Sequence, residues 1–186
     1  MKTEDFHHIL SQINAEGHST PLPVKEVKNV EDLLELLSTI TDPEIPVINI
    51  RELGILRSVE LVNEIYQINI SPTYSGCPAM GLIEMNIKAV LDTNHISNYK
   101  INTILYPPWT TDWITDETKL KLKQFGIAPP QIKKRIQSLF EKESVHCPRC
   151  QSKHTEIISE FSSTACKAMY RCLDCKEPFE YFKCHS

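Results

Sequence analysis

The cysteines with the most specific spacing lie near the C-terminus of the chain. They form two Cys-x-x-Cys pairs, Cys147 with Cys150 and Cys172 with Cys175, which residues 151–171 separate. Each pair can place two thiolates on one side of a tight knuckle, and two knuckles together supply the four sulfur ligands of a tetrahedral site. Because such spacings indicate metal rather than disulfides in a reducing compartment, we predict a structural zinc ion here. Rubredoxin-like iron fits the same ligands and is the less favoured alternative.

Cys166 and Cys184 lie in the same region but outside this four-ligand set. We favour the interpretation that both are buried thiols that behave as small hydrophobic side chains. A second metal site or a redox pair is the alternative, and the residues leave it open. His146, His154 and His185 are close enough in sequence to replace a ligand, but four cysteines already complete a tetrahedral site.

Cys77 lies alone in the middle of the chain, at the start of a predicted helix. Backbone N–H groups at a helix N-terminus favour a thiolate and lower its pKa, so Cys77 is a candidate nucleophile or a labile ligand for metal or sulfur. A buried structural thiol is equally consistent with the pattern. No histidine lies nearby in sequence to complete a protease-like pair, so a hydrolase is an unfavoured interpretation.

Asp42 and Glu44 lie on a proline-containing loop and, with Thr73, could face Cys77. Carboxylates beside a thiol oppose its ionisation unless a cation is present. A mixed group of sulfur and oxygen donors therefore suits a metal site better than nucleophilic catalysis. The alternative is that the two carboxylates only cap their turn.

Hydrophobic patterns predict the elements that position these residues. Apolar residues at helical spacing, with a cap at one or both ends, predict helices at 29–41, 78–91 and 115–125. Alternating or β-branched runs predict strands at 55–61 and 65–70, joined by a hairpin at 62–64, and a third strand at 101–105. Three more strands are predicted at 155–161, 167–171 and 179–182. The fold class that follows is α+β, a compact α/β sandwich followed by a small β-rich zinc ribbon.

The same pattern divides the chain into four segments. They are an N-terminal extension at 1–28, an α/β domain at 29–128, a linker at 129–144 and the zinc ribbon at 145–186. Apolar residues at 6–13 allow a short amphipathic helix, and residues 131–143 are predicted to form a helical connector. The ribbon is too small to fold on an apolar core alone, so metal ligation should supply much of its stability.

Length and composition limit the classes of protein that fit. The chain has 186 residues, a formal net charge of -4 and 41% hydrophobic residues, which suits one ordinary domain with a small second module. The acidic balance argues against a general nucleic-acid binder. No apolar stretch approaches the ~20 residues of a membrane-spanning helix, and the N-terminus lacks an apolar signal core. We expect a cytoplasmic protein with neither nucleic acid nor membrane as partner.

Several segments carry a resemblance to a known family. In the first domain these are Asp42–Val47 (DPEIPV), Glu52–Ile55 (ELGI), Thr73–Ala79 (TYSGCPA) and Pro107–Trp113 (PPWTTDW). They resemble the metal–sulfur cluster assembly family, which includes the SufT-type proteins. With the ribbon segments at 163–172 and 177–184 attached, the chain resembles the accessory subunits of bacterial phenylacetyl-CoA epoxidases.

This resemblance implies a site and a role. Asp42, Glu44, Thr73 and Cys77 would belong to the cluster-handling site, with Trp113 beside it. The chain would be an accessory or maturation factor in aerobic phenylacetate catabolism that assists assembly of an iron or iron–sulfur centre, with a transient iron–sulfur cluster or iron as cargo. Its partner would be the catalytic oxygenase or the iron–sulfur reductase of the epoxidase. The alternative is a stoichiometric structural subunit, and in neither case do we expect the chain to be the catalyst.

Overall fold

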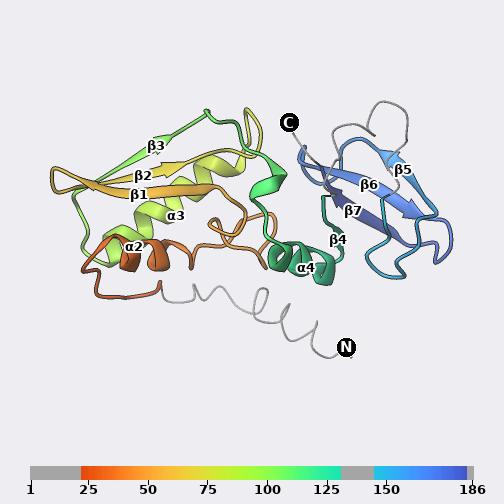
Figure 1. Cartoon of the computed structure of the whole chain (residues 1–186), viewed down its shortest axis with the longest axis horizontal. Coiled ribbons are helices and arrows are strands. Elements are labelled where there is room, and N and C mark those ends of the chain that lie inside the picture. Colours follow the sequence, from red (N-terminus) through yellow and green to blue (C-terminus); the bar gives the residue numbers. More distant parts are fainter. Residues whose placement is uncertain (1–21, 131–144, 184–186) are drawn as a thin grey trace.

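The structure is a computed structural model that describes residues 22–130 and 145–183. The predicted segment at 6–13, the predicted connector at 131–143 and Cys184 lie outside the described residues. Within the described ranges the chain forms an α/β domain and a β-rich ribbon, which lie next to one another along the long axis of the molecule (Figure 1). The predicted α+β fold class is confirmed.

The sheet of the first domain has the strand order β1-β2-β3, with bounds Leu56–Val62, Ile65–Ile70 and Tyr99–Thr103. β1 and β2 are antiparallel and are joined by a two-residue turn, Asn63 and Glu64. Both turn residues have positive φ, 50° and 62°, as a tight hairpin with native twist requires. The predicted hairpin is therefore confirmed.

β3 pairs in parallel with β2, so the chain between them must cross over the sheet. Helix α3 (Ala79–Thr93) makes this crossover and buries Ile83, Ile87 and Leu91 against the sheet, on which Ile68 and Ile70 are fully buried. Cys77 lies just before α3, so the crossover also determines where this thiol lies.

Two further helices flank this core, α2 (Val30–Leu37) and α4 (Asp116–Phe125). The Asn29 side chain accepts the backbone N–H of Asp32, and Gly126 ends α4 with a left-handed φ of 96°. These caps are as predicted, and Thr115 caps the start of α4 in the same way. A short 3-10 helix, η1 (Thr111–Trp113), precedes α4.

The prediction that the first helix continues to Thr41 was wrong. α2 ends at Leu37, because the hydroxyls of Ser38 and Thr39 each donate at 2.6 Å to carbonyl oxygens of the last turn. Thr41 instead pairs with Asn49 in an isolated antiparallel bridge. Side-chain to backbone hydrogen bonds of this kind compete with helix continuation. They begin the loop that carries Asp42 and Glu44.

The ribbon sheet has the order β4-β7-β6-β5. The three strands predicted in the ribbon are present as β5 (Thr155–Ser159), β6 (Lys167–Cys172) and β7 (Pro178–Phe182), and neighbouring strands are antiparallel. The fourth strand, β4 (Ile127–Ala128), directly follows α4 and pairs in parallel with β7. The sequence indicated only a break in pattern at this point, so the strand that the first domain adds to the ribbon sheet was not predicted.

The two modules also share apolar packing. Phe182 at the end of β7 is 1% exposed and belongs to the same hydrophobic cluster as the core of the first domain. Its ring lies 6.0 Å from that of Trp109 in an edge-to-face arrangement. Cys166, immediately before β6, belongs to this cluster too. The junction is therefore a packed interface.

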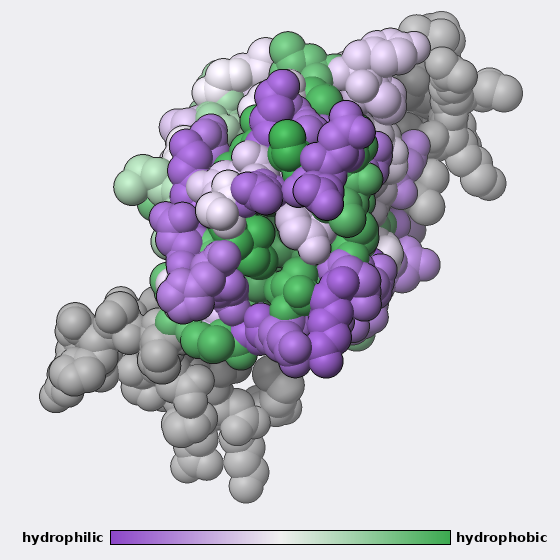
Figure 2. Space-filling view, turned by 90° about the vertical axis from the view of Figure 1, so that its left-hand side faces the viewer, coloured by the Kyte–Doolittle hydropathy of each residue, from purple (hydrophilic) through white to green (hydrophobic). Residues whose placement is uncertain are grey.

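The end of the first domain that faces away from the ribbon has a mixed surface. Hydrophobic side chains reach the surface there among hydrophilic ones (Figure 2). Leu61, Val62 and Ile65, around the β1–β2 turn, are exposed. Over the described residues, no helix has the length and apolar character needed to span a membrane.

Candidate functional site

The four cysteines of the two Cys-x-x-Cys pairs come together in the ribbon. The sulfur atoms of Cys147, Cys150, Cys172 and Cys175 all lie within 4.8 Å of one another. The Sγ atoms of Cys147 and Cys175 are 3.8 Å apart, and those of Cys150 and Cys172 are 3.5 Å apart. A tetrahedral site with Zn–S bonds of ~2.3 Å has sulfur–sulfur edges of about 3.8 Å, so the donor set fits zinc. The four cysteines form a cluster whose geometry is suited to hold a metal ion.

The backbone around each knuckle is shaped to hold these sulfurs. Gln151 and Lys176, the residues directly after the second cysteine of each pair, both have a φ of 66°. This left-handed conformation costs little for glycine and more for other residues, so both positions store strain. In the second knuckle, the amide of Cys175 donates to Cys172 Sγ at 3.5 Å. Backbone hydrogen bonds from Cys175 lower the pKa of Cys172 to about 6, which favours the thiolate form that a metal binds.

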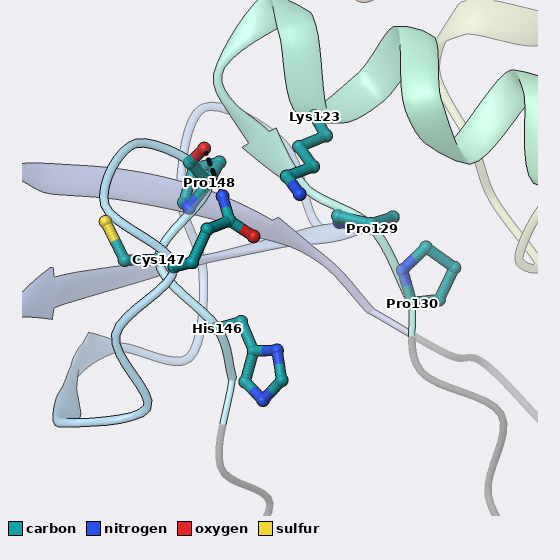
Figure 3. Close-up of a pocket in the computed structure, with 7 residues that line it drawn as sticks. Lys123, Pro129, Pro130, His146, Cys147 and Pro148 are labelled. Carbon is teal, nitrogen blue, oxygen red and sulfur yellow. Dashed lines mark hydrogen bonds between the residues drawn. The ribbon is translucent and has the colours of Figure 1, made fainter.

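A surface hollow lies beside the first knuckle but is not the metal site. It is lined by the end of α4, the prolines after β4 and the knuckle: Lys123, Pro129, Pro130, His146, Cys147, Pro148 and Gln151. Figure 3 shows the sulfur of Cys147 pointing away from Lys123 and the two prolines. The sulfur cluster and this hollow therefore lie on different sides of the knuckle backbone.

Cys77 is half-buried at the N-terminal end of α3. Burial raises the pKa of its thiol, and hydrogen bonds from the Ala79 amide and the Thr73 hydroxyl only partly offset this. The expectation that the helix N-terminus lowers the pKa of Cys77 was therefore wrong, because desolvation outweighs the backbone N–H groups. Burial at this position therefore favours the neutral thiol over the thiolate.

Asp42 and Glu44 lie beside this thiol, and the negative charge of each raises the pKa of Cys77 further. Asp42 is only 5% exposed, and its Oδ1 accepts the backbone N–H groups of Glu44 and Ile45 at 2.9 and 2.8 Å. Burial in turn raises the pKa of Asp42, although these two amides partly offset it. Asp42 thus caps the turn, and this cap determines where the Glu44 side chain begins.

Sequence reasoning missed a fifth member of this group, Cys166. Its Sγ lies 3.8 Å from a carboxylate oxygen of Glu44, and the residue is only 4% exposed. Burial raises the pKa of the Cys166 thiol to about 11, and the charges of Glu44 and Cys77 add to this effect. The feature of the sequence that could have indicated this position is the separation of six residues between Cys166 and Cys172. Six residues of extended chain span about 20 Å, so a thiol at 166 lies at the opposite end of β6 from the metal cluster.

Trp113, which was predicted to lie beside this group, packs against an aromatic ring and a guanidinium group. Its ring contacts Trp109 at 6.5 Å between centroids, and the guanidinium of Arg57 lies 3.2 Å above it. Trp109 in turn lines a cavity of about 210 Å³ together with Thr73 and Tyr74. Ser71 lines the same cavity, and its hydroxyl has no hydrogen-bond partner among the described residues.

Two family models match the two modules. The model described as an iron-sulfur cluster assembly protein matches residues 30–95, and the model described as a PaaD zinc beta ribbon domain matches residues 132–183. The fold and the two cysteine groups therefore define a class of protein, in which an iron–sulfur cluster assembly domain is joined to a zinc ribbon domain.

Three known proteins are similar to this chain. A protein of Escherichia coli (strain K12), provisionally named as one of the subunits of 1,2-phenylacetyl-CoA epoxidase, is 46% identical over 155 residues, 83% of this chain and 93% of that protein. An Fe-S protein maturation auxiliary factor of Porphyromonas gingivalis (strain ATCC BAA-308 / W83) is 29% identical and covers 50% of this chain and 89% of its own. A crystal structure of a DUF59 domain of unknown function from Bacillus anthracis covers 50% of this chain and 90% of its own, with 29% identity and a TM-score of 0.46. The chain belongs to the PaaD-type family of phenylacetyl-CoA epoxidase subunits.

Proposed function

We propose that this chain is an accessory factor of a phenylacetyl-CoA epoxidase that assists assembly of an iron or iron–sulfur centre in a partner subunit. The partner is the catalytic oxygenase or its iron–sulfur reductase. The relatives support both halves of the proposal, because one is named as an epoxidase subunit and another as a maturation factor. The cargo is iron, alone or in a cluster, and it is a substrate of the process rather than a resident cofactor.

The observation that carries this proposal is the surroundings of Cys77. Two carboxylates, Asp42 and Glu44, and the Thr73 hydroxyl lie at a half-buried thiol whose pKa is raised by burial. A nucleophilic cysteine needs the opposite conditions, with positive charge or a base close by. A thiol beside oxygen donors, without a compensating cation, is suited to bind one. A half-buried position near the surface also allows the cation to be passed on.

The ribbon cluster has a different role in this proposal. Four cysteines saturate a tetrahedral zinc ion and leave no open position for cargo or substrate. We therefore assign the ribbon one structural zinc ion, which stabilises the ribbon fold.

Replacement of Cys77 by Ser tests the proposal in cells that lack the native gene. Ser keeps the size of the side chain and its hydrogen bonds but cannot replace a soft ligand. We expect a folded protein that still co-purifies with the epoxidase components, while epoxidase activity and the iron content of the partner fall at least tenfold. Ser75→Ala, an exposed change in the same loop, is the matched control and should behave as wild type.

Full activity with Cys77→Ser would contradict the proposal and favour the structural-subunit alternative. Loss of activity with loss of co-purification would also favour that alternative, because the defect would then lie in complex formation. A partner that acquires its full iron content without this chain would contradict the assembly role outright.

A further inference from the structure

The junction between the modules collects anionic donors that come from both sides. Asp42, Glu44 and Cys77 belong to the first domain, whereas Cys166 belongs to the ribbon. These side chains interact electrostatically, since Glu44 raises the pKa of both thiols and Cys77 raises that of Cys166. Four acidic groups in a desolvated place repel one another when ionised. A bound cation would offset this repulsion and so favour the ionised thiols.

The one buried cation among the described residues offsets only part of the negative charge of this group. Lys167 is next to Cys166 in sequence, and its side chain is 4% exposed. Its ammonium donates to Glu180 at 2.9 Å, so its charge is already paired within the ribbon. Hydrogen bonds, including that from Lys167, outweigh burial and lower the pKa of Glu180 to about 2, which keeps this partner ionised. Burial raises the pKa of Asp42 and of Cys166, and the charge of Lys167 offsets this only in part, so a bound cation would add favourable charge at the donor group.

The loop that carries Cys166 is held in a defined conformation. Oε1 of Glu180 accepts hydrogen bonds from the hydroxyls of Ser162 and Ser163 at 2.5 and 2.8 Å, while its Oε2 accepts from Lys167. At the other side of the loop, the carbonyl oxygen of Cys166 accepts the amide of Lys183 at 2.8 Å. These bonds fix the thiol position without any contribution from the thiol itself.

The Cys166 side chain belongs to the hydrophobic cluster of the first domain, but two polar groups also lie near its sulfur. The Thr164 hydroxyl lies 3.0 Å away and the Glu44 carboxylate 3.8 Å away. A cysteine that serves only as a small hydrophobe is expected among apolar groups, where a thiol loses little on burial. A thiol between a hydroxyl and a carboxylate resembles a ligand position, because oxygen donors complete the coordination of a thiolate-bound cation.

We infer that Cys166 is the second sulfur ligand of the Cys77 site, so that iron binds at the junction between Cys77 and Cys166 with Glu44 as an oxygen ligand. This inference rests on the proposed function, because the bound iron is its cargo. Each thiol releases its proton to water as its sulfur binds iron, and no group is oxidised or reduced. The ribbon then holds a closed zinc site at one end and supplies one ligand of an open iron site at the other end.

Anaerobic iron uptake by the full-length, zinc-loaded chain tests this inference. Zinc binds thiolate sites more tightly than ferrous iron, so prior loading keeps iron out of the ribbon cluster. One arm offers Fe2+ alone, and a second arm offers Fe3+ with sulfide, the ions of an oxidised [2Fe–2S] cluster. Iron, zinc and acid-labile sulfide per chain are then measured with the absorption spectrum.

We expect wild type to bind iron in at least one arm, with sulfur-to-iron charge-transfer absorption. Cys166→Ser and Cys77→Ser should weaken iron binding equally, by more than the 10–100-fold that loss of an outer-shell partner typically costs. Cys184→Ser, which also removes one thiol, is the matched control and should bind as wild type. Zinc content and thermal unfolding should be unchanged in all three variants, and Cys166→Ala provides a second variant if Cys166→Ser folds poorly.

Several outcomes would overturn the inference. Wild-type iron binding in Cys166→Ser, with loss in Cys77→Ser, would remove Cys166 from the site but leave the proposed function intact. Equal loss in Cys184→Ser and Cys166→Ser would show that the effect is not specific to the junction ligand. No iron uptake by wild type in either arm would refute the site, whereas the epoxidase assay with Cys77→Ser would still test the proposed function separately.

Discussion

The two ends of strand β6 carry cysteines in opposite surroundings. Cys172, at one end, lies among three other sulfur atoms within 4.8 Å, and backbone N–H groups lower its pKa to about 6. Cys166, just before the other end, lies beside a carboxylate, and burial raises its pKa to about 11. The first environment is complete for a tetrahedral metal ion, and the second is not. The comparison shows that the neighbours of a cysteine, rather than the residue type, distinguish a structural ligand from a candidate cargo ligand.

The same contrast appears in how the two groups are built. The ribbon cluster comes from two local turns, each of which brings two ligands together within four residues. The junction group combines the loop after α2, the loop before α3 and the loop before β6, which are far apart in the sequence. Short-range geometry is sufficient for the first group, whereas the second exists only after the modules pack.

The largest expected effect is that of Cys172→Ser, which changes a residue of the ribbon cluster and none of the junction group. Cys172→Ser removes one of four ligands from a site whose binding free energy, typically about 10–16 kcal/mol for structural zinc, is also folding free energy. We expect loss of the metal and unfolding of the ribbon strands, measured by zinc content and by near-ultraviolet circular dichroism of the ribbon aromatics. The first domain should remain folded but less stable, because it loses its packing with Phe182.

Cys166→Ser, at the other end of β6, is the matched control. Its hydroxyl can hydrogen-bond with Glu44 and Thr164, so we expect zinc to be retained and the free energy of unfolding to change by about 1 kcal/mol or less. Zinc retention in Cys172→Ser would contradict the ligand assignment. Ribbon unfolding in Cys166→Ser would show that both thiols are structural and would remove the contrast.

This difference in construction explains how much of the molecule could be predicted from the sequence. The ribbon ligands, the hairpin and the caps at Asn29 and Gly126 depend on residues a few positions apart, and each was predicted. No local spacing joins Cys77, Thr73, Asp42 and Glu44. They were grouped first as loop residues that could face one another and then through the family resemblance. Tertiary packing determines the rest, namely strand β4, the position of Cys166 and the raised pKa of Cys77.

The second prediction concerns whether zinc binding depends on the packing of the junction. Phe182 is 1% exposed and packs edge-to-face on Trp109, so Phe182→Ala should cost about 3–5 kcal/mol. Zinc should stay bound, because the change leaves all four sulfur ligands in place. Chemical denaturation with zinc content measured alongside checks both expectations. The exposed Phe161, at 64%, provides the control, and Phe161→Ala should change stability by about 0.5 kcal/mol or less.

If Phe182→Ala released zinc as Cys172→Ser does, the two ends of the ribbon would form one cooperative unit. The comparison between a closed local site and an open junction would then no longer hold energetically. If instead Phe182→Ala kept its zinc but lost iron uptake at the junction, module packing would be the feature that assembles the second group.

The smallest predicted effect is confined to the ribbon knuckle. Gln151 adopts a φ of 66°, which costs a non-glycine residue about 1–2 kcal/mol, so Gln151→Gly should relieve strain. Part of this gain is lost, because glycine adds entropy to the unfolded chain and the exposed hydrogen bond from Gln151 to the Pro148 carbonyl, 2.9 Å long, disappears. We expect a net stabilisation of about 0.5 kcal/mol, which corresponds to roughly a twofold higher zinc affinity in competition with a chelator.

The matched control for Gln151→Gly is Lys153→Gly, two residues further along the same exposed loop and outside the positive-φ residues of the chain. There glycine relieves no strain and adds only unfolded-state entropy, so zinc affinity should fall slightly. Iron uptake at the junction should be unchanged in both variants, because the knuckle and Cys166 lie at opposite ends of β6. If Gln151→Gly lowered zinc affinity as Lys153→Gly does, then the Gln151 side chain, and not the backbone geometry of the knuckle, would be what stabilises the closed site.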